Sequence, residues 1–107
     1  MREPTFLILT ALAGASRHGY GIAREVRELS DGRVTLLTGT LYTALDRLVA
    51  EGLIEPDRAE EVDGRLRRYY RLTAGGLAAV TAETARLRHL ATAAEARLRT
   101  VRPRPAS

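Results

Sequence analysis

The chain has 107 residues, of which 45% are hydrophobic, a length and composition that suit one domain with a small core and at most an extended element. It contains no cysteine, which excludes disulfides and thiol chemistry and fits a reducing compartment such as the cytoplasm. Its lack of a long uncharged run excludes a membrane-spanning helix. The net charge is +4, but arginine and acidic residues balance over residues 1–72. The excess therefore lies in residues 73–107 and gives no evidence for nucleic-acid binding.

Residues 5–14 are apolar on nearly every side of a predicted helix, with Phe6 and Leu9 among them. A helix without a polar face must be buried on most sides, which a small domain cannot easily achieve alone. We therefore expect this helix to lie partly in a subunit interface, the alternative being the central core helix of a monomer. Glu3 and Pro4 interrupt the charged start that a signal peptide needs, so we expect none.

A turn over residues 15–21 leads to a second predicted helix, from about Tyr20 to Leu29. Its inner stripe is apolar and its outer face is charged, as in an amphipathic helix at a protein surface. We expect His18 to cap this helix or to satisfy the turn. A metal role would need further ligands, and the other histidine, His89, is far along the chain.

The segment TGTLYTALDRLVAEGLI, residues 38–54, predicts a short helix with clear ends. Thr38 is expected to be its N-cap, and Gly52 is expected to take the left-handed conformation that ends it. One face is an apolar stripe, and the opposite face is small, polar and rich in hydroxyls. Such a face is either solvated or enters a DNA groove. Two short helices joined by a tight connector, the second with a polar outer face, are typical of a helix-turn-helix.

Residues 53–73 predict a β-hairpin with Asp63 and Gly64 at its turn. Pro56 lacks an N–H donor, so the first arm should be an edge strand or carry a bulge. Four arginines and two tyrosines interleave over residues 65–71 of the second arm and form a dense basic cluster. Guanidinium groups bind phosphates through paired hydrogen bonds; alternatively, these arginines neutralise the acidic residues of the facing arm.

From Thr73 onward the apolar residues recur at alternating spacings of three and four, which predicts a long helix with a coiled-coil seam. A helix of about 25 residues spans about 38 Å, too long for the preceding domain to cover, so we expect a second copy of the chain to cover it. The residues assigned to this interface, two of them from the first helix, are Phe6, Leu9, Leu77, Val80, Leu87, Ala91, Ala94 and Leu98. The tail, residues 102–107, contains two prolines and is predicted to be disordered.

Four blocks of the sequence resemble the signature of a known family. They are HGYGI at 18–22, GTLYTAL at 39–45, LVAEGLI at 48–54 and RRYYRLT at 67–73. In this order and spacing they look like the PadR family of bacterial transcriptional regulators, and the single C-terminal helix resembles its short subfamily. The resemblance implies a winged helix-turn-helix homodimer that represses transcription, often of its own operon, and that is often relieved by a small-molecule effector.

Two departures from the family pattern matter. Thr43 replaces the proline of the family's GTLYPAL block. Since proline is tolerated only near a helix start, threonine at this position is structurally harmless. The multidrug-sensing members of the short subfamily stack planar drugs on a tryptophan of the last helix. This chain has no tryptophan, so the resemblance does not extend to that site.

The predicted fold is mainly α with a small β-hairpin: a winged helix-turn-helix over residues 1–73, a dimerisation helix over residues 74–101 and the tail over residues 102–107. The second helix of the motif would enter the major groove, and the hairpin would reach the flanking backbone or the minor groove. The residues expected to contact double-stranded DNA are Tyr20, Thr38, Gly39, Thr40, Tyr42, Thr43, Arg47, Arg65, Arg67 and Arg68.

We expect no catalytic, metal or cofactor site. The sequence shows no nucleophile motif and no glycine-rich phosphate loop after a strand, so an enzyme is disfavoured. The remaining alternative is a winged-helix module for protein–protein contact, with the long helix as its interaction surface.

Overall fold

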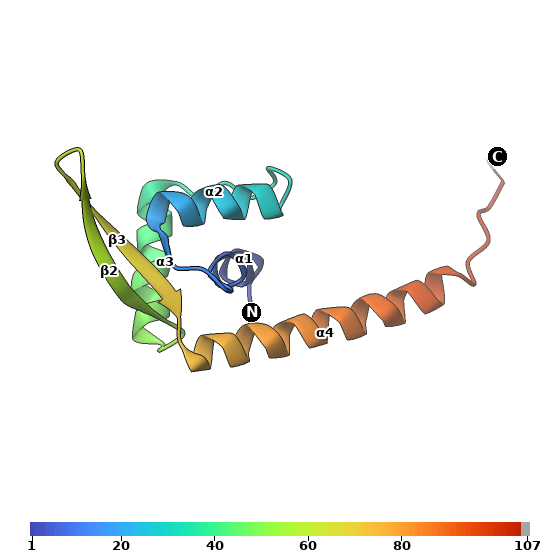
Figure 1. Cartoon of the computed structure of the whole chain (residues 1–107). Helices are drawn as coiled ribbons and strands as arrows, with labels where there is room; N and C mark the ends of the chain where they lie inside the picture. Colours follow the sequence, from blue (N-terminus) through green and yellow to red (C-terminus); the bar gives the residue numbers. More distant parts are fainter. Residues whose placement is uncertain (106–107) are drawn as a thin grey trace.

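The computed structural model describes residues 1–105 as four helices and a three-stranded sheet (Figure 1). The elements in chain order are α1 (Glu3–Ala11), β1 (Arg17–His18), α2 (Gly19–Leu29), α3 (Thr38–Ala50), β2 (Ile54–Val62), β3 (Arg65–Leu72) and α4 (Ala74–Leu98). The first three helices lie beside the hairpin of β2 and β3, and α4 runs from the end of β3 past α1 and away from the domain (Figure 1). The predicted mainly-α winged fold with a long last helix is therefore confirmed.

Apolar side chains from α1, α2 and α3 meet in one core against the hairpin and the start of α4. The side chains with almost no exposed surface are Ile8, Leu9, Leu12, Ile22, Val26, Leu45, Leu48 and Ile54. α1 is thus part of the core of the single chain, and its partial placement in a subunit interface stays a prediction. Leu9 is completely buried because α2 and α4 pack on α1, so its assignment to a subunit interface was wrong. Phe6 is half-buried at the edge of this core.

Side-chain caps fix where α2 and α4 begin. The Nδ1 atom of His18 accepts a hydrogen bond from the N–H of Gly21 at 3.1 Å, which confirms the predicted cap of α2. In the same way, Oγ1 of Thr73 accepts a hydrogen bond from the N–H of Gly76 at 2.9 Å. Each cap satisfies an N–H that has no partner within its helix.

The start of α3 differs from the prediction. Its N-cap is Leu37, which has an extended backbone (φ −70°, ψ 151°), whereas Thr38 is already the first helical residue. The assignment of Thr38 as the cap was therefore wrong, because a cap must keep a non-helical backbone while its side chain reaches back to the first turn. The end of α3 agrees with the prediction, since Gly52 has the left-handed φ of +75°.

The strands are antiparallel neighbours in the order β1–β3–β2. Asp63 and Gly64 form the predicted turn of the hairpin, both with positive φ (+51° and +74°). Pro56 lies on the edge strand β2, and the pairing register shifts between Pro56 and Ala59. Both expectations for Pro56, an edge position and a bulge, are therefore confirmed.

The third strand, β1, was not predicted. It is two residues long, with Arg17 opposite Tyr70 and His18 opposite Tyr69 of β3. Two residues are too few to show an alternating pattern in a sequence. The pairing matters because it joins the start of α2 directly to the wing.

α4 leaves the domain after its first turns and makes the molecule 64 Å long (Figure 1). Val80 is buried against the domain, but Leu87, Leu90 and Leu98 are 39%, 50% and 68% exposed. The helices of residues 1–105 include none with the length and apolar character to cross a membrane. Of the predicted disordered tail, residues 102–105 form neither helix nor strand, and residues 106–107 lie outside the described part of the chain.

Candidate nucleic-acid interface

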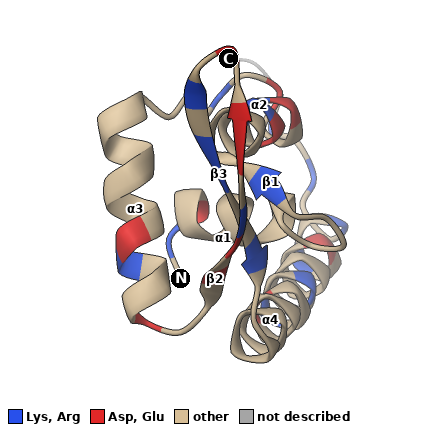
Figure 2. Ribbon diagram, turned by 60° about the vertical axis from the view of Figure 1, so that its left-hand side comes forward, with Lys and Arg blue, Asp and Glu red and all other residues tan. Residues whose placement is uncertain are grey.

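The outer face of α3 is small, polar and open to solvent. Thr38, Gly39, Thr40 and Thr43 are all exposed, and a Cβ atom built on Gly39 would meet nothing within 4 Å. The first turns of α3 carry no charged side chain, and they lie at the same end of the molecule as the tip of the hairpin (Figure 2). The free N–H groups of this helix start are therefore not neutralised by an acidic residue, which favours approach of an anion.

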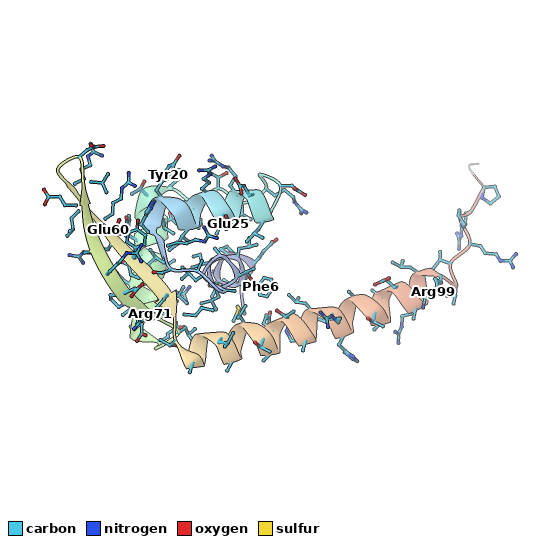
Figure 3. All side chains as sticks on the ribbon, in the orientation of Figure 1. Phe6, Tyr20, Glu25, Glu60, Arg71 and Arg99 are labelled. Carbon is cyan, nitrogen blue, oxygen red and sulfur yellow. The ribbon has the colours of Figure 1, made fainter. Side chains whose placement is uncertain are left out.

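Two tyrosines flank this helix start. Tyr20 points outward from the first turn of α2 (Figure 3) and is 70% exposed. Tyr42 of α3 is 41% exposed. The hydroxyl end of the Tyr42 side chain packs closely against Gly19, so a Cβ atom at position 19 would require that side chain to shift. A cleft of about 280 Å³ separates the two helices, and Arg24, Arg27 and Thr38 contribute to its lining. Arg24 and Arg27 were not among the predicted contacts. Their spacing of three residues, which places both on one face of α2, could have indicated this basic face from the sequence.

His18 connects α2 to the wing. Its ring meets the Tyr69 ring of β3 edge to face, with 5.2 Å between ring centres. Partial burial is the main cause that lowers the pKa of His18, the nearby Arg67 guanidinium lowers it further, and Glu60 opposes the shift. The neutral imidazole is the form that caps α2, because Nδ1 must carry a free lone pair to accept the Gly21 N–H.

We expect the protein to lose stability as the pH falls below the ordinary histidine pKa of 6.5. The unfolded chain then takes up a proton at His18 that the folded chain binds less readily, so the stability present above this pH is lost as the pH approaches the lowered folded pKa. Urea midpoints measured between pH 7.5 and pH 5.5 test this. His18→Asn keeps a capping acceptor and should flatten the pH dependence, whereas His89→Asn on the exposed face of α4 should leave it unchanged. Equal slopes for His18→Asn and the natural chain would remove His18 as the cause.

Part of the wing neutralises itself. Nε of Arg71 lies 2.8 Å from a Glu55 carboxylate oxygen and Nη1 lies 3.1 Å from Asp57, while Nε of Arg58 lies 2.9 Å from Glu60. The Arg58 guanidinium also stacks over the Tyr69 ring at 4.0 Å and, with the Tyr69 hydroxyl, lowers the pKa of Glu60. The neutralised-wing alternative therefore holds for Arg71.

The tip of the wing remains basic. Arg65, Arg67 and Arg68 are exposed, and within residues 1–105 none of them has an acidic group at ion-pair distance. Figure 2 shows these basic residues along β3 and the acidic residues along β2. Arg67 lies opposite Glu60 in the hairpin, but none of the three guanidinium groups is held in an ion pair, so all three are available to bind phosphates beside the open face of α3.

Arg68 lies on the side of the wing that faces α3. It lines a cleft of about 360 Å³ together with Tyr42, Asp46, Leu66 and Tyr70. Burial is the main cause that raises the pKa of the Tyr70 hydroxyl, with Asp46 and Tyr42 adding to the shift. Tyr70 therefore stays neutral and supports the hairpin against the helices, and the cleft beside it carries both a basic group, Arg68, and an acidic one, Asp46.

Arg47 is placed differently from the other predicted contacts. Its Nη2 donates to Oγ1 of the buried Thr5 at 2.9 Å, and its Nη1 lies 3.1 Å from Glu51. These partners engage both terminal nitrogens of the guanidinium, although the Arg47 side chain also lines an open hollow beside Gly39, Thr40 and Thr43 of α3. The sequence could not show this, because Thr5 is 42 positions away along the chain. We leave Arg47 out of the contacts proposed below.

The residues assigned to a dimer interface divide into two groups. Leu77, Leu87, Ala91, Ala94 and Leu98 are exposed along α4. Val80 is buried against the chain's own core, and Leu90, which was not assigned, is half exposed. Residues 1–105 contain no group of three histidine, cysteine or acidic side chains arranged to hold a metal ion.

Comparison with known proteins places this arrangement in a family. Residues 8–82 match the sequence model of the transcriptional regulator PadR-like family. The transcriptional regulator Rv3488 of Mycobacterium tuberculosis is 41% identical over 71% of this chain and 57% of its own length, so the chain spans little more than half of that relative.

Two solved structures show the same fold. The PadR family transcription regulator of Clostridium difficile is 30% identical, with a TM-score of 0.74 over 91% of this chain and 99% of its own. Bacillus subtilis PadR in complex with operator DNA is 21% identical, with a TM-score of 0.65 over 100% of this chain and 52% of its own. From the family match and the likeness to the Clostridium difficile regulator, the chain belongs to the PadR-like family of transcriptional regulators and has its winged-helix fold.

Proposed function

We propose that this protein represses transcription by binding, as a homodimer in the cytoplasm, to a pseudo-palindromic operator. The observation that carries the proposal is the juxtaposition of two features: the open hydroxyl face of α3 and the unneutralised arginines of the wing tip. A small-residue face admits base edges, and arginines beside it bind the flanking phosphates.

In the proposed complex, α3 enters the major groove with its first residues nearest the bases. Thr40 and Thr43 contact base edges. The hydroxyl groups of Tyr20 and Tyr42 donate hydrogen bonds to phosphates near the cleft between α2 and α3. Arg65, Arg67 and Arg68 bind the backbone beside the adjacent minor groove. These three arginines extend from the hairpin. Because β1 pairs with β3 and leads into α2, we expect the hairpin and the helices to bind as one unit.

The proposed homodimer forms along α4. Its exposed leucines, at positions 77, 87, 90 and 98, lie on a helix that leaves the domain, and its outer turns pack against no other element of residues 1–105. Small residues at positions 91 and 94 allow a second helix to approach closely. Two copies related by a two-fold axis would read half-sites about one helical turn, or about 34 Å, apart.

We further propose that a small-molecule effector relieves repression by tilting α4, since the tilt sets the distance between the two α3 helices. A shallow cleft of about 410 Å³ lies between the end of α1 and the start of α4, lined by Thr10, Ala13, Leu77, Thr81 and Arg88 among others. Its walls are aliphatic, hydroxyl and guanidinium groups. A ligand bound there would be held by these groups and not by stacking on an indole.

The double variant Arg67→Ala/Arg68→Ala is expected to weaken DNA binding on every sequence. Each lost phosphate contact lowers the slope of log K against log salt by about 0.9, so the slope should fall by about 2 and affinity by about 10- to 100-fold. Titrations at several salt concentrations with the purified protein measure both. Arg99→Ala, at the far end of α4, is the matched control and should keep the full slope (Figure 3).

An unchanged slope in the double variant would remove the wing from the contacts. Selection of binding sites from random DNA with the natural protein tests the wider proposal. Thr40→Ala and Thr43→Ala should each alter the selected motif. Failure to select any motif, together with a stable complex with a different protein, would favour a protein–protein module instead.

A further inference from the structure

Leu37 is an unusual residue for its position. It is the N-cap of α3, and its side chain is 73% exposed. Leucine is among the least favourable N-cap residues because it offers no oxygen to the free N–H groups of the first turn. It also gains nothing by burial here, whereas its neighbour Leu36 is half-buried against the core. The folded chain alone therefore gives no reason for leucine at position 37.

The surroundings of Leu37 leave it accessible to a large partner. The next three residues, Thr38, Gly39 and Thr40, are all exposed and small, and the space around Gly39 is open. Tyr20 of α2 and Tyr42 of α3 line the neighbouring cleft between the two helices, and Leu37 is not part of its lining. Leu37 is thus the large apolar side chain at the end of α3 that is proposed to face the bases.

We propose that Leu37 determines part of the operator sequence by contacting the C5-methyl group of a thymine in the major groove. This inference rests on the DNA-binding function proposed above. The thymine methyl is the apolar group that base edges present in the major groove, and aliphatic side chains recognise it by contact. Placing the methyl against the Leu37 isobutyl group removes apolar surface of both from water. No other base offers this gain at the same place.

The test replaces each thymine of the selected operator with deoxyuridine, which lacks only the methyl group. For the natural protein, one thymine position in each half-site should be sensitive, and a single replacement there should weaken binding by about four-fold, the effect expected for one apolar carbon removed from water. For Leu37→Ser, the same replacement should have no effect, because the side chain that contacts the methyl is gone. The dissociation constants of both proteins on both DNAs form a double-mutant cycle.

Leu37→Ser separates this role from folding. Serine supplies the missing N-cap oxygen, so thermal stability should hold or rise by a few degrees, about the effect of one restored cap. Leu29→Ser is the matched control. This leucine is the last residue of α2 and is 45% exposed, and its replacement should leave the loss of affinity on deoxyuridine DNA unchanged.

Two outcomes would count against the ideas, and they differ. If Leu37→Ser retains the same sensitivity to deoxyuridine as the natural protein, or if no replacement weakens the natural protein, Leu37 does not read a thymine methyl. If the natural protein selects no DNA motif at all, the DNA-binding proposal itself fails.

Discussion

Gly76→Ala is expected to destabilise the protein by about 3 kcal/mol or more and to lower its melting temperature by about 15 °C. Gly76 lies in the first turn of α4, where it is buried against the loop that follows α3. A Cβ atom at this position would overlap the backbone carbonyl of Leu53. That carbonyl cannot move aside easily, because it also accepts a hydrogen bond from the N–H of Thr73 at 3.2 Å. Thermal unfolding followed by circular dichroism measures the effect.

Gly75→Ala is the matched control for this variant. The nearest atom to a Cβ there is the Gly52 carbonyl oxygen at 3.4 Å, which is an ordinary contact. Alanine also favours a helix over glycine by up to about 1 kcal/mol, so this variant should be as stable as the natural chain or slightly more stable. Equal stability of Gly76→Ala and Gly75→Ala would show that α4 does not begin in the close contact described here.

Leu87→Asp is expected to convert the proposed homodimer to monomers and to weaken operator binding by at least about 100-fold. Leu87 is 39% exposed in the single chain and does not line the cleft between α1 and α4. A second α4 helix packed on this position would have to bury an unpaired carboxylate, which costs far more than the lost leucine contact. A monomer then presents one α3 helix to one half-site and loses the linked second contact.

Sedimentation velocity and operator titration test this prediction together. Ala96→Asp is the control, since nine residues along an α-helix place it on the opposite side of α4 from Leu87, where it is exposed. That variant should remain a dimer and bind normally. A Leu87→Asp protein that still sediments as a dimer would contradict the proposed interface, and a monomer with unchanged operator affinity would contradict the linked half-sites.

Local patterns in the sequence predicted most of the elements because those elements depend on near neighbours. The spacing of apolar residues predicted α2, α3 and α4, and the Asp-Gly pair predicted the hairpin turn at Asp63 and Gly64. The proline at position 56 predicted an edge strand with a bulge, because a missing N–H has the same consequence in any fold. The family resemblance added the order of these elements in a winged helix-turn-helix.

The misses share a different cause. β1, the burial of Leu9 and the partners of Arg47 all depend on contacts between segments far apart in the chain. A two-residue strand is too short to show a period. An apolar helix has the same sequence pattern whether it lies in a core or in an interface. An arginine on a polar face can turn toward a hydroxyl group from a distant part of the chain. None of these choices leaves a local pattern.

For the candidate site, the residue types and their spacing already specified an exposed hydroxyl face on α3 and an arginine-rich hairpin. Which arginines remain basic was decided by folding: β2 brings Glu55, Asp57 and Glu60 beside Arg71 and Arg58, and leaves the tip unneutralised. The exposed leucine at the N-cap of α3 was likewise decided by folding, since a shift of the helix start by one residue changes which side chain stands at its end. Electrostatic and cap interactions depend on distances of a few ångströms, and those distances exist only after the strands and helices have come together.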